Sequence, residues 1–175
     1  MIGIPYSYRL FGYEYAIDVP PARPVHALPA PAAGLRPATR ADLPALARLQ
    51  DAAQAGADVA MPHPAARLRW LVAHEASTTW VLERDGAVVA SARLPGPDDE
   101  VLAAEPTAVD QTAAEALLAG VAVLAAGRPV RVTDRPGSLP GRVWAGRLGA
   151  GSDLAEQYFA RVPTPARCST RSGRC

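Results

Sequence analysis

The chain has 175 residues, enough for one ordinary domain whose hydrophobic core needs no disulfide or metal. Its 18 basic and 17 acidic residues give a net charge of +1, which argues against DNA or another nucleic acid as a partner. No apolar run approaches the roughly 20 residues of a membrane span, and no signal peptide opens the sequence. We therefore expect a soluble cytoplasmic protein without a membrane partner.

Four of the five tyrosines (Tyr6, Tyr8, Tyr13 and Tyr15) lie in the first 18 residues, with no signal that would begin a domain. Residues 19–34 follow and are rich in proline and alanine. Each proline fixes its own φ and restrains the residue before it, so this stretch predicts an extended, poorly packed linker.

The sequence changes character at Leu35, where a short strand leads into a helix. Thr39 is a good N-cap, and Asp42 three residues later makes a shorter-armed capping box. A second helix is predicted over 64–76. Trp70 there, and Trp80 after it, lie on periodic apolar faces, so we expect both in the core.

Two alternating runs meet at Asp85-Gly86, a pair suited to the positive φ angles of a tight hairpin turn. A weaker strand is expected within 100–108. A long helix then begins at the N-cap Asp110 and stops at Gly127; its lack of charges predicts burial on most sides.

The end of the sequence is more variable. It predicts a strand at 129–134, an irregular Gly/Pro-rich segment at 136–152 and a last strand within 156–163. The fold class is therefore α/β (α+β), with a mixed, mostly antiparallel sheet flanked by helices. The tail holds both cysteines, Cys168 and Cys175, which are too few for a zinc site, and no metal site is expected.

The element order resembles that of the GNAT superfamily of acetyl-CoA-dependent N-acetyltransferases. Such domains end with a tyrosine four residues before a Gly-aromatic pair, as Tyr8, Gly12, Tyr13 and Glu14 stand here. The chain is similar to a tandem-GNAT protein of the enhanced-intracellular-survival type. Residues 1–18 resemble the end of a first domain, 19–34 a linker and 35–162 a divergent second domain, followed by an irregular tail at 163–175.

The resemblance implies acetyl transfer from acetyl-CoA to a primary amine on a small molecule or peptide, with Tyr8 as the catalytic acid. It also implies a glycine-containing loop before the helix at 110, whose N–H groups hold the cofactor's pyrophosphate. No glycine stands there. The segment carries carboxylates instead, at Asp98, Asp99, Glu100, Glu105 and Asp110. We expect no cofactor-binding residues in this chain and little catalysis by the chain alone.

Several weaker signals stay open. Gly146-Arg147-Leu148-Gly149-Ala150-Gly151 has the glycine spacing of a phosphate loop, although an ordinary turn is the simpler interpretation. A general-base role for His63 or His74 is the less favoured alternative to a structural one. Tyr8 could be only a packed aromatic. The tail is also compatible with a frameshifted or truncated product.

A different class of function is the alternative: a non-catalytic binding or scaffolding module that packs on a partner domain. A partner GNAT domain and a homo-oligomer are both compatible with the sequence. Binding of acetyl-CoA is the observation that discriminates the two classes.

Overall fold

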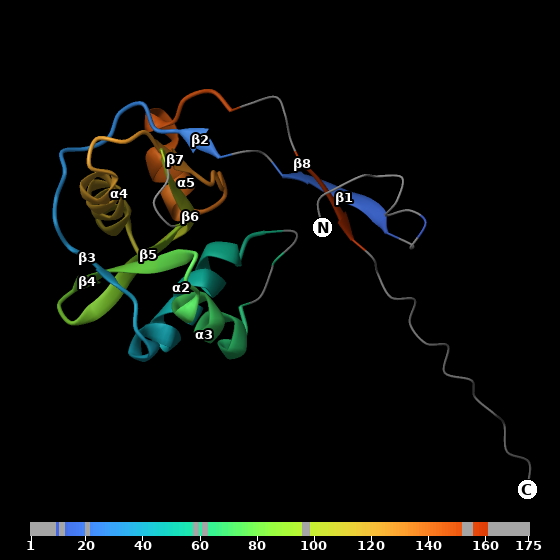
Figure 1. Cartoon of the computed structure of the whole chain (residues 1–175), viewed down its shortest axis with the longest axis horizontal. Coiled ribbons are helices and arrows are strands. Elements are labelled where there is room, and N and C mark those ends of the chain that lie inside the picture. Colours follow the sequence, from blue (N-terminus) through green and yellow to red (C-terminus); the bar gives the residue numbers. More distant parts are fainter. Residues whose placement is uncertain are drawn as a thin grey trace, which may run out of the picture. The chain divides into compact units, whose positions relative to one another are not determined.

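The computed structural model describes residues 10, 13–19, 22–57, 60, 63–95, 99–151 and 156–160 (Figure 1). The chain divides into two compact units, one of residues 21–152 and one formed by its two ends. In the described part, no helix is long and apolar enough to cross a membrane.

Residues 21–152 build a six-stranded sheet in the order β2-β7-β6-β5-β4-β3. All neighbouring strands are antiparallel except β6 and β7, which are parallel. The expected mixed, mostly antiparallel sheet is thus confirmed. Its strands are β2 (Arg23–Pro24), β3 (Leu35–Pro37), β4 (Ser77–Arg84), β5 (Ala87–Pro95), β6 (Val101–Ala108) and β7 (Val130–Val132).

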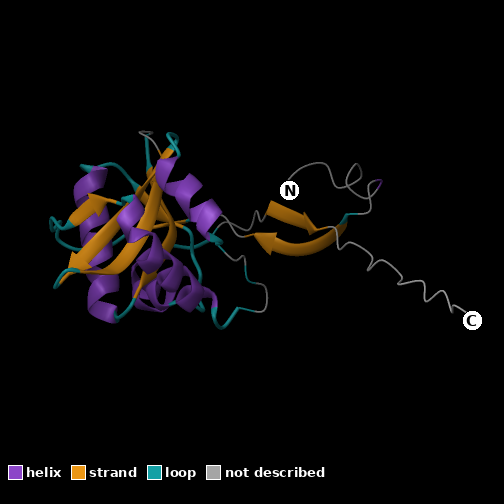
Figure 2. Cartoon of the chain, turned by 90° about the horizontal axis from the view of Figure 1, so that it is seen from below, coloured by secondary structure: helices purple, strands orange, loops and turns teal. Residues whose placement is uncertain are grey.

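Helices cover both faces of this sheet (Figures 1 and 2). Helices α2 (Leu43–Gln54) and α3 (Ala65–Ala73) pack on one face, where Leu46, Leu68 and Val81 form a small core. Helices α4 (Gln111–Ala125) and α5 (Leu139–Trp144) contribute to the larger core, which includes Leu117 and Trp144. The sheet is therefore the middle layer of three.

Helix α4 confirms the expectation of a mostly buried helix. Nine of its 15 residues are buried, because small and apolar side chains occupy most of its faces. After the helix, Ala126 and Gly127 both have left-handed backbone conformations, with φ of 51° and 86°. The helix thus ends where the sequence predicts.

The hairpin between β4 and β5 also lies where the sequence places it. Asp85 and Gly86 have φ of 54° and 74°, the left-handed conformations of a tight primed turn. Trp80 on β4 packs against the larger core, as expected.

The expectation of an irregular segment over 136–152 is wrong, because this segment contains α5 and a short 3₁₀ helix (Ala145–Arg147). The Ser138 hydroxyl accepts a hydrogen bond from the Gly141 N–H at 3.2 Å and so caps the helix. Trp144 at its end is buried and donates from Nε1 to the Ala114 carbonyl at 3.0 Å. This tertiary contact fixes a helix too short for a periodic sequence pattern.

Part of the segment expected to be a linker is packed. Arg23 and Pro24 pair with β7, and the Arg23 guanidinium lies 2.7 Å from the Asp134 carboxylate. The other unit contains β1 (Glu14–Val19), which pairs antiparallel with β8 (Glu156–Ala160). The expected strand within 156–163 therefore exists, and its partner is β1. The boundaries of the proposed domains stay a prediction.

Trp70 is 58% exposed, so its expected place in the core is wrong. Its ring lies 4.3 Å from that of His74, one turn further along the chain. Leu68 and Leu71 occupy the buried side of α3, and at helical spacing Trp70 then points away from them.

The capping box at the start of α2 extends into an ion-pair network. Asp42 Oδ2 accepts from the Thr39 N–H at 2.7 Å and from Arg36 Nη1 at 2.8 Å, while Arg36 Nη2 also contacts Glu83 at 2.8 Å. The hydrogen bond from Arg36 is the main reason that the pKa of Asp42 lies well below its usual range. Edge strand β3 is thereby tied to both α2 and β4.

This network predicts a pH-dependent stability. Asp42→Asn should lower the free energy of unfolding at pH 7 by about 1–3 kcal/mol, because the buried Asp42 side chain loses its charge-assisted hydrogen bonds to the half-exposed Arg36. A carboxyl with a lowered folded pKa stabilises above its unfolded pKa of about 4 and loses that effect as the pH falls further. The difference from wild type should thus shrink below about pH 4 in urea unfolding. Exposed Asp51→Asn is the control; a deficit that is equal at pH 7 and pH 3 would contradict the network.

The close packing at the start of α5 gives a second prediction. A Cβ at Gly141 would overlap the backbone carbonyl of Arg135, whereas one at Gly146 meets nothing within 4 Å. Gly141→Ala should therefore lower the free energy of unfolding by on the order of 1–3 kcal/mol. Gly146→Ala should stay within about 0.5 kcal/mol of wild type. Equal stability of the two variants in thermal unfolding would contradict this packing.

Candidate functional site

The N-terminal end of α4 is the position at which the GNAT resemblance implies a pyrophosphate loop, and at which the sequence has no glycine. The structure puts the Asp110 carboxylate there: its Oδ1 accepts from the Ala113 N–H at 2.7 Å, and its backbone carbonyl accepts from the Ala114 N–H. Asp110 is thus the N-cap that the sequence predicts. A backbone donor that could have held an anion is already satisfied within the chain.

Arg84 binds the other oxygen of the same carboxylate. Its Nη2 lies 2.6 Å from Asp110 Oδ2. This hydrogen bond, followed by the one from Ala113, lowers the pKa of Asp110, so the group is ionised at neutral pH. An incoming pyrophosphate would meet a like charge at this end of the helix.

The carboxylates expected to crowd this position do not all gather there. Glu105 lies in the middle of β6 and faces His63 and Arg93, and Glu100 lies beside Arg131 at 3.8 Å. Asp98 lies outside the described residues. Asp110 is therefore the carboxylate placed at the start of α4, where it is paired with Arg84.

A β-bulge places Glu105. Ser91 of β5 is opposite Thr107, but Arg93 is opposite Ala104, so β6 carries one extra residue there. Glu105 takes φ of 50°, an uncommon left-handed conformation for a residue in a strand. Its backbone carbonyl accepts from Gln50 Nε2 at 3.4 Å.

The Glu105 carboxylate joins a buried polar cluster. His63 Nε2 lies 3.5 Å from Oε1, and Arg93 Nε lies 3.3 Å from Oε2. The neighbouring cavity has a volume of about 20 Å³, enough for about one water molecule and too small for an amine substrate. The cluster supports a structural role for His63. His74, the residue after α3, lies with its ring tilted against that of Trp70.

A much larger cavity of about 780 Å³ lies where β6 and β7 part. The two strands pair only over Val101–Ala103 and Val130–Val132; β6 then continues to Ala108 while the chain after β7 turns into α5. Small or apolar residues such as Ala52, Ala108, Val109 and Leu139 line the cavity, together with Arg135 and Arg142.

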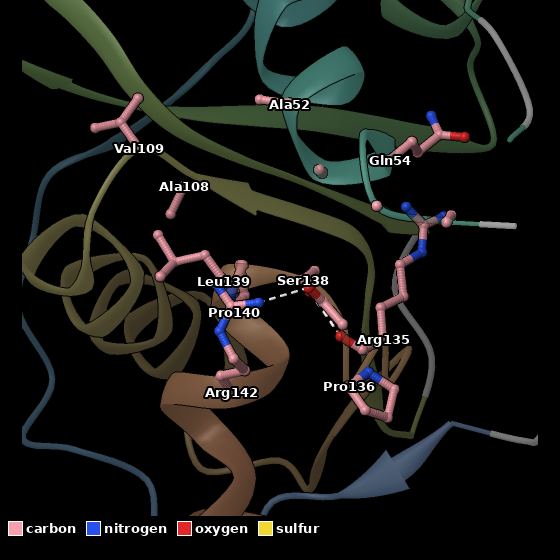
Figure 3. A pocket seen from close by; sticks show the side chains of 14 residues that line it. Ala52, Gln54, Ala108, Val109, Arg135, Pro136, Ser138, Leu139, Pro140 and Arg142 are labelled. Carbon is pink, nitrogen blue, oxygen red and sulfur yellow. Dashed lines mark hydrogen bonds between the residues drawn. The ribbon is translucent and has the colours of Figure 1, made fainter.

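Arg135 lines this cavity, and a hydrogen bond to its backbone carbonyl fixes its main chain. Its carbonyl accepts from the Ser138 hydroxyl at 2.8 Å, and its side chain extends toward the end of α2 that carries Gln54 (Figure 3). The sequence carries no pattern that singles out this arginine, because its position depends on the turn before α5. The Ser138-Leu-Pro-Gly run is the local signal for that turn.

In the glycine-spaced segment 146–151, two backbone N–H groups are already bonded within the chain. The N–H groups of Leu148 and Gly149 already donate to the carbonyls of Ala145 and Pro24. Leu148 also bridges to Val25 at the edge of the sheet. These contacts favour the simpler interpretation as a turn. Tyr8, the expected catalytic acid, lies outside the described residues, as do both cysteines.

Comparisons with known proteins agree on the fold. No protein-family model and no curated protein matches the sequence. A GCN5-related N-acetyltransferase from Kribbella flavida superposes with a TM-score of 0.62 over 90% of this chain, at 15% sequence identity. An acetyltransferase of the GNAT family from Novosphingobium aromaticivorans gives a TM-score of 0.54 over 86% of this chain, at 14% identity.

The two neighbours differ in how much of their own length this chain matches. The chain spans 41% of the Kribbella flavida protein and 68% of the Novosphingobium aromaticivorans protein. At these identities the likeness concerns the arrangement of helices and strands. The chain has the fold of the GNAT acetyltransferases.

Proposed function

We propose that this chain is part of a GNAT-type N-acetyltransferase of the tandem kind and that it does not catalyse acetyl transfer by itself. In the parent reaction, an acetyl group passes from acetyl-CoA to a primary amine of a small molecule or peptide. The fold and the coverage of only 41% of the Kribbella flavida protein support this proposal. Residues 1–18 would then be the end of a first domain, with Tyr8 as that domain's acid.

The single observation that carries the proposal is Asp110 at the start of α4. A cofactor site of the family's kind needs several free N–H groups and close backbone approach to the pyrophosphate. Here the Ala113 N–H is bound by a carboxylate that Arg84 keeps ionised, and the preceding residue is Val109. Each absent charge-assisted hydrogen bond would weaken cofactor binding by on the order of 1.5–3 kcal/mol.

We therefore expect acetyl-CoA to bind the wild-type chain more weakly than about 1 mM in calorimetry. Asp110→Gly, which removes the charge and frees the Ala113 N–H, should tighten binding. Asp110→Asn keeps an N-cap without the charge and should tighten it less. Glycine and asparagine are both accepted at an N-cap, so both variants should fold.

Two results would contradict the proposal. One is micromolar binding of acetyl-CoA by the wild-type chain. The other is acetylation of a primary amine that Tyr8→Phe abolishes, because it would make Tyr8 a working acid in this chain.

A non-catalytic binding or scaffolding module is the second candidate. The exposed Trp70 ring, in tilted contact with that of His74, favours it, because large aromatic side chains are enriched where proteins bind one another. Chemical crosslinking of the chain to a partner domain, weakened by Trp70→Ala and unchanged by Arg67→Ala on the same helix, would support this role. Equal crosslinking of both variants would exclude Trp70 from it.

A further inference from the structure

We propose that the outer edge of β8 pairs with the same edge of a second copy of this chain, so that two β1–β8 ribbons join into one antiparallel sheet. This inference goes beyond the proposed function, because it concerns self-association and requires no acetyl transfer. The two strands form a sheet of their own, in which β1 is the one described neighbour of β8 (Figure 1). On its other edge, β8 presents backbone N–H and C=O groups that no described strand pairs.

A sheet of two strands needs further support. Two strands alone are at best marginally stable in water, and a third strand or a packed helix is needed for independent stability. The ribbon shares no strand with the six-stranded sheet of residues 21–152, and its own strands come from opposite ends of the chain. Bringing such distant segments together costs loop-closure entropy. A second ribbon beside β8 would give each copy the third strand.

The two edges of the ribbon are not equally protected against further pairing. Strand β1 carries Glu14 and Asp18, and it holds one extra residue between Tyr15 and Ile17, where the pairing with β8 shifts. Charged side chains and bulges are devices that keep strand edges from pairing further. Strand β8 reads Glu-Gln-Tyr-Phe-Ala, with one charge at its start and neither lysine nor proline. The edge of β8 is therefore the one that is open to another strand.

The sequence of β8 also suits pairing with itself. In an antiparallel pair centred on Tyr158, a two-fold axis places this residue opposite its counterpart, and aromatic pairs at such positions are favourable. Glu156 then stands opposite Ala160, so no two carboxylates face each other. Five residues from each copy make a small interface. We therefore expect a weak dimer, with a dissociation constant on the order of 100 μM.

The test is sedimentation velocity combined with hydrogen exchange on the full chain. A reducing buffer prevents Cys168 and Cys175 from linking two copies. Between about 5 μM and about 500 μM, the wild type should pass from monomer to dimer. At the lower concentration, only the N–H groups of residues 156–160 that point toward β1 should be protected from exchange. At the higher concentration, the alternate N–H groups should gain protection as well.

Tyr158→Lys places two like charges at the centre of the strand pair and should weaken dimerisation by about tenfold or more. Tyr158→Phe keeps the aromatic pair and should dimerise like the wild type. Trp70→Lys on α3 is the matched control, because it makes the same kind of change at another exposed aromatic residue and should leave the dimer intact. Exchange protection within residues 14–19 shows whether the ribbon persists in each variant. If Tyr158→Lys disrupts the ribbon, the concentration dependence of exchange in the wild type decides.

Three results would overturn the proposal. One is a wild-type chain that stays monomeric at the higher concentration. Another is a dimer that Trp70→Lys breaks and Tyr158→Lys does not, because the contact would then lie on α3. The third is full protection of residues 156–160 in the monomer, because another part of the chain would then cover the edge. Each of them leaves the expected weakness of acetyl-CoA binding untouched, so the two proposals can fail separately.

Discussion

The carboxylate of Asp110 connects the start of α4 to the end of β4. It caps α4 through Ala113, and Arg84 ties it to the end of β4, beside the hairpin turn. Helix α4 in turn supplies buried residues to the larger core and accepts the Trp144 side chain at the Ala114 carbonyl. The same carboxylate that starts this helix also occupies the position where the helix could have held an anion. The cap of α4 and the proposed loss of cofactor binding thus depend on the same carboxylate.

The parting of β6 and β7 is the second constraint. Three residues of each strand pair, and a Thr133 N–H still donates to the Ala103 carbonyl at 3.0 Å before the two chains separate. Strand β6 goes on through the bulge at Glu105, and α5 begins on the other side. The cavity lies beside the end of β6, the end of α2 and the start of α5. Its arginines give it a chemistry different from that of a glycine loop at a helix N-terminus.

Local signals in the sequence were sufficient for several elements. Asp85-Gly86 predicted the hairpin because both residues must take positive φ, and Asp110 predicted a helix start because its side chain reaches a nearby N–H. Thr39 and Asp42 predicted the capping box for the same reason. Each of these elements depends on residues that lie within three positions of one another in the sequence.

The elements that were missed depend on distant contacts. Helix α5 is fixed by Trp144 on α4 and by the close approach of Gly141 to Arg135, and its six residues show no period. Strand β2 contains a proline and exists because β7 offers an edge. Trp70 satisfied the apolar pattern of α3 yet is exposed, since periodicity alone could not decide which face meets the sheet. Arg135 belongs to no periodic or motif pattern in the sequence, because its place beside the cavity depends on the turn before α5.

The most direct measurement is an NMR titration of the chain with acetyl-CoA that follows the backbone N–H signal of Ala113. Because the Asp110 carboxylate already binds this N–H, it should be closed to the cofactor's pyrophosphate. The Ala113 signal should therefore not change at acetyl-CoA concentrations up to about 1 mM. A saturable shift of that signal in the micromolar range would contradict it.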